Sequence, residues 1–283
     1  MRFIFTADLH GNRHQYEKVF AYAADNGIPT IILGGDLTPK DEPSRTPFHQ
    51  RMFLKEFLFP LIEKNKDKNI LLLMGNDDFK SNESFLYESQ ESVGFHLFDN
   101  KSVFLDGIYF VGYSSVPYTP FVWKDWEKRD LESDTGRNLR KETLREGFIS
   151  QGDDFIKKDI FEDMKRSSIE GDLEKLTLDI PAEKLILVTH APPNRTCCDY
   201  TQRKDGKLAH VGSKAVRKII EKRQPLLSLH GHIHDTVQNT GVFPDYLNKT
   251  VCAAVGNDHL GERPHIIVAK IGNNITLVRE RLY

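Results

Sequence analysis

Five short apolar segments, each followed by polar residues that can bind metal ions, constrain the fold of this chain more than any other feature. In chain order, these polar residues are Asp8 with His10, Asp36, Asn76, His190, and His232 with His234. A short apolar run bounded by turn residues predicts a buried strand. The C-terminal ends of parallel strands lie along one edge of a sheet, where α/β proteins place their binding sites. We therefore expect these side chains to converge at a sheet edge.

The first 80 residues alternate between strand-like and helix-like patterns. Strands are predicted over 1–7, 30–33 and 70–74, and amphipathic helices over 13–26 and 48–61. Strands that alternate with helices in this way pair in parallel, with helical crossovers between them. This order predicts the α/β class.

After residue 95 the pattern changes to short strands with close turns, which favour antiparallel pairing. The first three are predicted near 96–98, 102–106 and 108–113. Alternation of strand and helix then returns, with a strand over 185–188, a helix near 213–223, a strand over 226–229, and C-terminal strands over 250–255, 264–271 and 274–280.

Residues 114–180 are predicted to be an insertion, and a candidate lid, within a single domain that spans residues 1–283. The insertion begins with an aromatic run, which is typical either of a hydrophobic layer beneath the insertion or of a lid over a concave site. A charged stretch over 127–146 is predicted to face solvent. A helix is predicted after it. The aromatic residues are Tyr118, Phe121, Trp123 and Trp126, and the helix would carry Phe155, Ile156, Ile160 and Met164.

The composition argues against several classes of protein. The formal net charge is -2 and the pI is near 6.6, so no basic bias draws the surface to nucleic acid or anionic lipid. No stretch approaches the ~20 apolar residues that a membrane helix requires. The three cysteines, Cys197, Cys198 and Cys252, favour reduced thiols and a cytoplasmic location.

The predicted ligands are oxygen and imidazole nitrogen atoms, with no thiolate. Such ligands suit Mn, Fe, Zn or Ni ions and disfavour a structural zinc–thiolate site. Seven groups exceed what one catalytic ion can bind while it keeps an open position, whereas two ions can share them through a bridging carboxylate. Two ions roughly 3.5–4 Å apart can activate a water and stabilise both oxygens of an in-line phosphoryl displacement.

In these motifs the chain resembles the calcineurin-like metallophosphoesterase superfamily, and within it the small bacterial and archaeal phosphoesterases. The resemblance is carried by Asp8-Leu9-His10, Gly35-Asp36, Gly75-Asn76, His190 and Gly231-His232-Ile233-His234. It implies a four-layer α-β-β-α sandwich, the metallo-dependent phosphatase fold, with the site at one edge. It also implies two divalent or trivalent metal ions, for which we favour manganese. Asp8, His10 and His234 would hold the first ion, Asn76, His190 and His232 the second, and Asp36 would bridge them.

One position departs from the family pattern. Many members have a histidine after the asparagine, where it protonates the leaving group or stabilises the transition state, but this chain has Asp77. An aspartate with an ordinary pKa is ionised at pH 7 and cannot donate a proton. An adjacent metal ion would lower its pKa further. The change therefore favours a substrate with a good leaving group, or a proton donor from elsewhere.

Three residues outside the metal motifs are candidates for contact with the substrate: Asn12, Arg195 and His210. Asn12 follows the first motif, and Arg195 lies in a loop. His210 lies in His210-Val211-Gly212-Ser213, just before a predicted helix, and similar branches of the family carry a similar motif. His210 is the leading candidate for the proton donor, and the backbone N–H groups of Gly212 and Ser213 would form a phosphate cradle.

The expected function is metal-dependent hydrolysis of a phosphoester, in which a hydroxide that bridges the ions attacks phosphorus in line. Asp36, Asn76 and His210 are the expected catalytic residues. The missing histidine favours a phosphodiester, since an aryl or cyclic leaving group needs less help from an acid. Three alternatives remain open: a phosphomonoesterase or nucleotidase of the same fold, a non-catalytic metal-binding interaction scaffold, and a nuclease. The expected partner is a small phosphoester, of which a nucleotide is one candidate. Nucleic acid and membranes are not expected partners.

Overall fold

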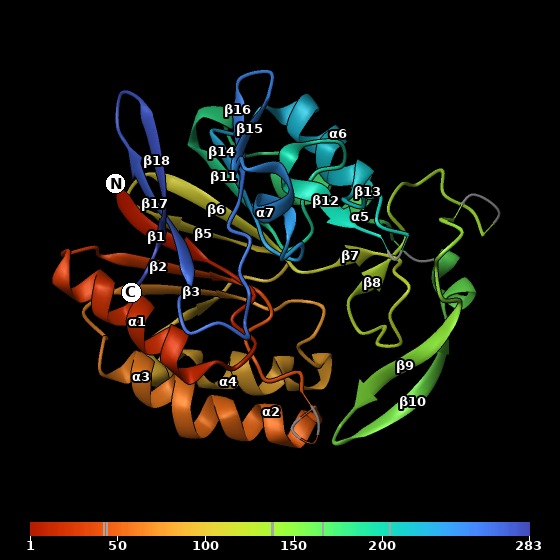
Figure 1. Ribbon diagram of the computed structural model, residues 1–283, viewed down its shortest axis with the longest axis horizontal. Coiled ribbons are helices and arrows are strands. Elements are labelled where there is room, and N and C mark those ends of the chain that lie inside the picture. Colours follow the sequence, from red (N-terminus) through yellow and green to blue (C-terminus); the bar gives the residue numbers. More distant parts are fainter. Residues whose placement is uncertain (42, 44, 137–138, 166, 204) are drawn as a thin grey trace.

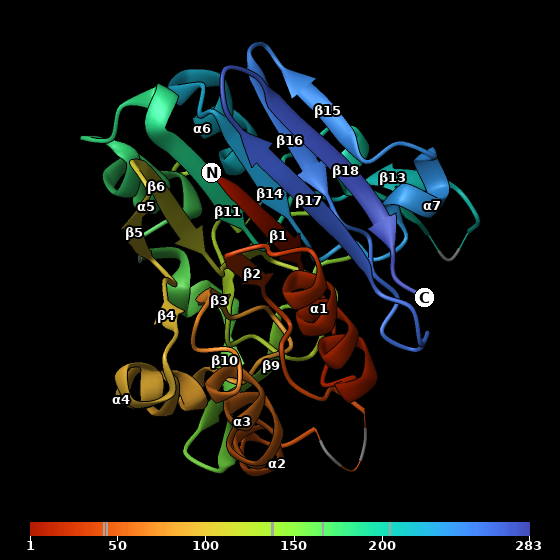
Figure 2. The same cartoon turned by 90° about the vertical axis from the view of Figure 1, so that its left-hand side faces the viewer.

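Two six-stranded sheets that pack face to face form the centre of the computed structural model, and helices cover their outer faces (Figure 1). The structure describes residues 1–41, 43, 45–136, 139–165, 167–203 and 205–283. Figure 2 shows α1 to α4 on one side of the paired sheets and α5 and α6 on the other. The α/β class and the four-layer α-β-β-α sandwich expected from the sequence are confirmed.

The first sheet has the strand order β18-β17-β1-β2-β3-β4. Its strands are β1 (Arg2–Thr6), β2 (Thr30–Gly34), β3 (Asn69–Leu73), β4 (His96–Leu97), β17 (His265–Ile271) and β18 (Ile275–Arg281). Strands β1 to β4 pair in parallel, whereas β17 and β18 are antiparallel to their neighbours. The expected antiparallel pairing near 96–98 is therefore wrong, because α4 returns the chain to the starting edge of the sheet before β4 begins.

The helical elements on the outer face of the first sheet come from the crossovers between its parallel strands. They are α1 (Arg13–Asp25), α2 (Pro47–Phe53), the π-helical segment η1 (Leu54–Leu58), α3 (Phe59–Glu63), the 3-10 segment η2 (Lys80–Asn82) and α4 (Glu83–Val93). Successive residues of β1 explain why its sequence is apolar throughout. Phe3 and Phe5 pack between the two sheets, while Ile4 packs against α1 on the other face.

The second sheet has the strand order β15-β16-β14-β11-β6-β5. Its strands are β5 (Lys101–Leu105), β6 (Ile108–Tyr113), β11 (Leu185–Thr189), β14 (Leu227–His230), β15 (Pro244–Leu247) and β16 (Thr250–Ala254). Strands β6, β11, β14 and β16 are parallel, and the outer strands β5 and β15 are antiparallel to them. Two helices, α5 (Ile169–Thr177) and α6 (Lys214–Arg223), pack on its outer face.

Short elements complete the second half of the chain. They are the 3-10 segments η4 (Ala182–Lys184) and η5 (Cys197–Asp199), the hairpin strands β12 (Tyr200–Gln202) and β13 (Leu208–His210), and α7 (Thr236–Thr240). Cys197, Cys198 and Cys252 are all free thiols. None of the helices in the described parts of the chain has the length and apolar character needed to cross a bilayer.

The predicted insertion 114–180 contains a β-hairpin where the sequence indicated a helix. Its elements before α5 are β7 (Val116–Pro117), β8 (Glu127–Lys128), β9 (Glu146–Gln151), β10 (Asp154–Asp159) and the 3-10 segment η3 (Ile160–Lys165). The helix expected around Phe155 and Ile156 is wrong. Gly152, with φ 64°, allows a two-residue turn that pairs β9 with β10. Residues 137–138 and 166 of the predicted insertion lie outside the described residues.

Candidate metal centre

The five ligand motifs follow the C-terminal ends of five strands at one edge of the sandwich. β1, β2 and β3 of the first sheet lead to Asp8 with His10, to Asp36 and to Asn76, and β11 and β14 of the second lead to the histidines. Backbone hydrogen bonds join neighbouring motifs, since His10 N donates to Asp36 O (2.9 Å) and Gly231 N donates to His190 O (3.2 Å). Both sheets therefore contribute side chains to one site.

A first group of ligand atoms comes from Asp8, His10, Asp36 and His234, and all four atoms lie within 4.8 Å of one another. His10 Nε2 is 3.1 Å from His234 Nε2. His234 Nε2 is 3.8 Å from Asp8 Oδ1. Two imidazole nitrogens and two carboxylates so close together form a donor set suited to a transition-metal ion.

A second group forms around Asn76. Its Oδ1 atom lies 3.0 Å from His190 Nε2 and 2.6 Å from His232 Nδ1. The other ring nitrogen of His190, Nδ1, lies 3.1 Å from the carbonyl oxygen of Gly34. A hydrogen bond from Nδ1 to that oxygen would leave Nε2 free to face an ion, which is how proteins usually orient a metal-binding histidine.

Asp36, a member of the first group, also reaches the second. Its Oδ2 atom is 3.5 Å from His10 Nε2 and 3.4 Å from His190 Nε2. Its Oδ1 atom accepts a hydrogen bond from the backbone N–H of Asp77 (2.8 Å). The carboxylate is thus held by the third motif and reaches both groups, which is the position that a bridging ligand requires.

The motifs place the ligands through unusual backbone geometry. Asp8, His10, Asp36 and His232 have φ angles of 61°, 42°, 53° and 68°, in the left-handed region that residues other than glycine rarely adopt. Such conformations are costly, and they cluster at functional sites. Glycine precedes Asp36 because the loops approach so closely: a Cβ atom on Gly35 would lie 2.4 Å from His190 Nδ1.

Burial and charge set the protonation of the ligands. Burial lowers the pKa of His232 to about 3 and that of His234 to about 4, so both rings stay neutral at pH 7, as metal ligands must. Burial also lowers the pKa of His190, but Asp36 and Asp8 raise it to about 9. Burial raises the pKa of Asp36, but His190 and His10 hold it well below its usual value. The site therefore keeps an anionic carboxylate at its centre, with His190 charged beside it and the rings of His232 and His234 neutral.

Asp77, which stands where many family members have a histidine, forms ion pairs with basic side chains. Arg45 Nη2 donates to Asp77 Oδ1 (2.5 Å), and Lys40 Nζ lies 3.9 Å from Oδ2. Burial and the neighbouring Asp36 raise the pKa of Asp77 to about 6, against the opposing effect of Arg45. At pH 7 Asp77 is therefore a carboxylate that serves as an anchor for Arg45.

Asp78 has a structural role that the sequence did not predict. The side chain is buried and accepts hydrogen bonds from the backbone N–H groups of Leu37 (2.9 Å), Thr38 (2.8 Å) and Gly75 (2.9 Å). It ties the loop after β2 to the loop after β3. The positions of Asp36 and Asn76 relative to each other depend on this carboxylate. Its partners in the first of these loops lie about 40 residues away in the chain, so no local sequence pattern indicates these contacts.

The predicted substrate contacts Asn12, Arg195 and His210 lie outside both groups. Asn12 Oδ1 caps α1 by accepting from Gln15 N (3.1 Å), and its Nδ2 donates to two loop carbonyls, so the amide is already engaged. His210 Nδ1 lies 2.6 Å from Asp199 Oδ1. Arg195 is exposed, and it lines a cavity of about 520 Å³ together with His210. Among the described residues, no hydrogen bond or ion pair joins these three side chains to the seven ligands.

The phosphate cradle expected at the start of α6 is wrong, because acceptors of the protein itself already bind its donors. Asp130 accepts from Ser213 Oγ (2.5 Å), Lys214 N (2.7 Å) and Ala215 N (3.3 Å). The N–H of Gly212 donates to Asp199 Oδ2 (2.9 Å), and the N–H of Ser213 donates to Pro192 O (2.8 Å). Both N–H groups of the expected cradle therefore already have acceptors within the described part of the chain.

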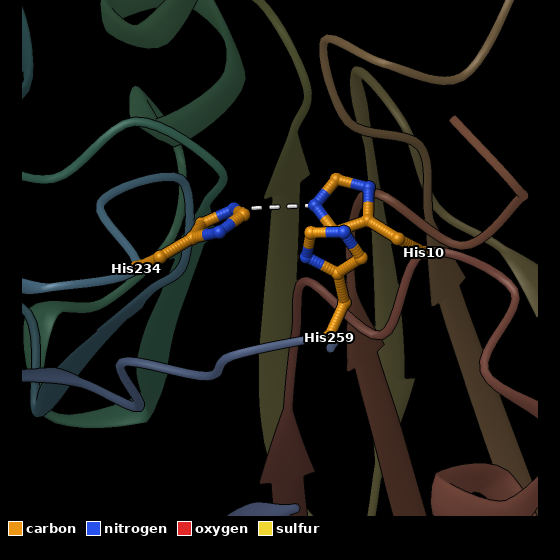
Figure 3. A group of neighbouring side chains, drawn as sticks. All are labelled: His10, His234 and His259. Carbon is orange, nitrogen blue, oxygen red and sulfur yellow. Dashed lines mark hydrogen bonds between the residues drawn. The ribbon is translucent and has the colours of Figure 1, made fainter. Parts of the chain in front are cut away.

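Sequence reasoning missed two further residues beside the first group. Lys40 Nζ lies 3.1 Å from His10 Nε2, so a cationic side chain borders the ligands. His259 lies against His10 and His234, as Figure 3 shows, with 4.8 Å between the ring centroids of His10 and His259. His259 lies four residues beyond the predicted strand 250–255 and belongs to none of the ligand motifs, so the sequence gives little signal for it.

Comparisons with known proteins agree with this geometry. The family model described as calcineurin-like phosphoesterase matches residues 1–236. No curated protein matches the sequence at a significant level. Protein TT1561 of Thermus thermophilus is 16% identical, with a TM-score of 0.55, over 94% of this chain and 93% of that chain. A dimetal phosphatase from Danio rerio is 12% identical, with a TM-score of 0.58, over 100% of this chain and 96% of that chain.

A third solved structure has a different description. GAP50, the anchor in the inner membrane complex of Plasmodium, is 10% identical, with a TM-score of 0.50, over 100% of this chain and 88% of that chain. At these identities the solved structures establish a shared fold and nothing more. What the site does must therefore be argued from its own side chains.

Proposed function

The chain belongs to the calcineurin-like phosphoesterase family, and on this basis we propose that it is a phosphodiesterase with a two-metal centre. Membership supports the coarser statement, that the chain is a metal-binding hydrolase of small phosphoesters. The proposal adds two bound ions, a preference for diesters, and specific roles for individual residues. Manganese is the ion we favour, since carboxylate, amide oxygen and imidazole ligands all suit it.

The position of Asp36 Oδ2 carries the proposal. This one atom lies 3.5 Å from His10 Nε2 and 3.4 Å from His190 Nε2, which belong to different ligand groups. No single ion needs so many donors. Asp8, His10 and His234 would hold one ion, Asn76, His190 and His232 the other, and Asp36 both. The donor set fits, because the histidines other than His190 are already neutral and Asp36 is already anionic.

When bound, two such ions would supply an activated water and positive charge for the phosphoryl oxygens. Groups of the protein orient the metal ligands and the substrate. The carbonyl of Gly34 orients His190, and Asp77 N–H orients Asp36. Lys40, with its side chain only 18% exposed, places an ammonium group beside His10, where it can bind a phosphate oxygen of the substrate.

The residue after Asn76 supports the preference for a diester. Asp77 stands in the place of the acid, and its carboxylate is held by Arg45 at 2.5 Å, so a proton from this position is disfavoured. A diester with a good leaving group needs little acid assistance. A phosphomonoesterase is the second candidate, because Lys40 and Arg45 together would suit the dianionic phosphate of a monoester. The scaffold alternative has less support, since the chain keeps all seven ligand side chains in contact.

The insertion 114–180 is proposed to act as a wall of the site rather than as a mobile lid. Trp126 Nε1 donates to the carbonyl oxygen of Asp78 (2.7 Å), and Trp123 packs against Phe79 with 5.0 Å between ring centroids. Arg45 lies over the Trp123 ring, 5.5 Å from its centroid. The aromatic run therefore supports the third motif and the Arg45–Asp77 pair from outside.

Metal content and hydrolysis of two substrates test the proposal. We expect the purified protein to hold two ions per chain and to hydrolyse bis-p-nitrophenyl phosphate faster than p-nitrophenyl phosphate. Asp36→Asn should lose metal and activity together, because a neutral amide cannot bridge two cations. Asp99→Asn is a matched control, since Asp99 is also buried and also accepts a backbone N–H, from Ser114 (2.9 Å).

Two results would contradict the proposal. A wild-type protein without stoichiometric transition metal would remove the two-ion centre. An Asp36→Asn variant that still hydrolysed bis-p-nitrophenyl phosphate at the wild-type rate would remove Asp36 as the bridge. Faster hydrolysis of the monoester would keep the centre and replace the diester preference with the second candidate.

A further inference from the structure

His259 contributes a third imidazole to the first ligand group. Figure 3 shows the rings of His10, His234 and His259 gathered around one space. Each ring offers a nitrogen, and the three nitrogens lie within 4.8 Å of one another. The rings come from separate loops, which follow β1, β14 and β16. A cluster of three imidazoles from three loops is a donor set that metal sites use and that ordinary packing does not require.

The distances are close to those of a metal site. Two nitrogens bound to one ion at about 2.0–2.1 Å lie at most about 4.2 Å apart. Contraction of the cluster by roughly half an ångström would therefore bring all three rings onto one ion. Within the described parts of the chain, His259 Nδ1 is buried and has no hydrogen-bond partner. The ring thus has a nitrogen available and a short distance to move.

The loop that carries His259 is held by amide side chains of the first turn of α1. Asn12 Nδ2 donates to the carbonyl oxygen of His259 itself (2.8 Å) and to that of Gly261 (3.1 Å). Gln15 Nε2 donates to the carbonyl oxygen of Asp258 (2.9 Å). The backbone on both sides of His259 is therefore fixed to the helix that follows the first motif.

The base of the same loop is fixed to the strand end beside Asp8. Asn257 is fully buried, and its Nδ2 donates to Thr6 Oγ1 (2.9 Å) and to the carbonyl oxygen of Ala7 (2.9 Å). Its Oδ1 accepts from His265 N (2.6 Å). The loop between β16 and β17 is thus built onto the first motif, which positions the imidazole before any ligand arrives.

We propose that His259 is a further ligand of the metal ion held by Asp8, His10 and His234. The inference rests on the proposed function, because it requires the two-ion centre. His259 would give this ion one more protein ligand than its neighbour. The ion held by Asn76, His190 and His232 would then keep the more open coordination sphere for a substrate oxygen. Asn12, expected from the sequence to contact substrate, becomes a positioning residue for His259.

Metal affinity measured without turnover tests this ligand. The metal-free full-length protein is titrated with Co²⁺ in competition with a coloured chelator, and the visible spectrum is recorded. In His259→Ala one of the two ions should bind at least about tenfold more weakly, and its spectrum should change, because one nitrogen donor is lost. The affected binding step should be the one that His234→Ala also weakens. His96→Ala, at an exposed position of β4, is the matched control.

A cavity-forming variant and a loop variant separate ligation from a structural effect. Free imidazole should restore the affinity and the spectrum of His259→Gly, which a merely structural role would not predict. Gln15→Met keeps the ring but loosens its loop, so it should weaken the same ion by a smaller factor. Folding of each variant is checked by circular dichroism.

Unchanged affinities and an unchanged Co²⁺ spectrum in His259→Ala would overturn the proposal, even if KM rose, since His259 would then contact the substrate instead. Asp36→Asn in the same titration separates this failure from that of the proposed function. If Asp36→Asn loses both ions while His259→Ala keeps both, the two-ion centre stands and only the His259 ligand fails. If the wild-type protein binds no pair of ions, the proposed function itself fails.

Discussion

The metal centre and the start of α6 are both loops that follow strands, and both were expected to bind ligands, yet the structure completes them differently. At the start of α6 the chain provides its own partner: Asp130 accepts from Ser213, Lys214 and Ala215. At the centre, potential metal-ligand atoms from separate loops converge instead: His10 Nε2 lies 3.1 Å from His234 Nε2 and 3.5 Å from Asp36 Oδ2. A polar loop is thus a better candidate for an external ligand where several such atoms converge than where the chain's own carboxylate occupies the donors.

His190→Ala should break the metal centre and leave the start of α6 intact, and it carries the largest expected effect. The variant removes an imidazole that contacts both Asn76 and Asp36. We expect loss of one ion per chain and a fall in kcat beyond the roughly 100-fold that loss of a ligand's hydrogen-bond partner can cost. Elemental analysis and hydrolysis of bis-p-nitrophenyl phosphate measure both. Retention of two ions would exclude His190 as a ligand.

Asp130→Ala should destabilise the start of α6 and leave the metal centre intact, because it removes the carboxylate that accepts hydrogen bonds there. Three donors would lose an anionic acceptor, so the free energy of unfolding should fall by about 1–3 kcal/mol. Urea denaturation measures this loss, and metal content should stay at the wild-type value. Asp130→Asn should lose less, because an amide oxygen can still accept. Loss of metal in Asp130→Ala would show that the two regions are coupled.

The pH dependence of stability should report on His230, which is buried and whose Nδ1 lies 2.9 Å from Thr189 Oγ1. Burial lowers the pKa of His230 from 6.5 to about 3. Between these values the unfolded chain binds a proton that the folded chain does not. The free energy of unfolding should therefore decrease as pH falls below 6.5, by up to about 1.4 kcal/mol per pH unit from this residue.

The contribution of His230 is isolated by comparison with His230→Gln, which cannot titrate. Urea denaturation of the metal-free proteins from pH 7 to about 4.5 should give a shallower slope for the variant over this range. Equal slopes for His230→Gln and the wild type would mean that His230 titrates normally in the folded chain.

Arg45→Met carries the smallest expected effect, at the boundary between the centre and the insertion. The side chains of Arg45 and Asp77 are 24% and 15% exposed, so solvent screens their ion pair in part. We expect the free energy of unfolding to fall by less than about 1 kcal/mol, and kcat to change by less than about fivefold. Arg51→Met, which loses the more exposed pair with Asp153, is the control. A loss of metal in Arg45→Met would show that the Arg45–Asp77 pair supports the metal centre.

The fold was predictable because its signals are local. A strand buried on both faces is apolar throughout, as Phe3-Ile4-Phe5 is, and the ligands follow such strands directly. The β9–β10 hairpin was not predictable in the same way. Phe155, Ile156 and Ile160 also fit the spacing of a helix, and only Gly152 hints at the turn.

The partners of single residues were less predictable than the fold, because they come from distant parts of the chain. Asp130 belongs to a charged stretch that was expected to face solvent, yet it is buried against residues more than 80 positions away. His259 meets His10 through a loop that crosses from one sheet to the other. Position along the chain gives no information about such contacts, whereas the ligand motifs are recognisable because each has its own strand.

Because the ligands are divided between the two sheets, the metal ions would also have a structural role. Asp8, His10, Asp36 and Asn76 belong to the first sheet, and His190, His232 and His234 to the second, so each proposed ion would fasten one layer of the sandwich to the other. Ions that bind only the folded chain would link the two sheets along this edge. The free energy of unfolding should therefore increase as the concentration of these ions rises. A chelator would then lower the free energy of unfolding by removing these links between the two sheets.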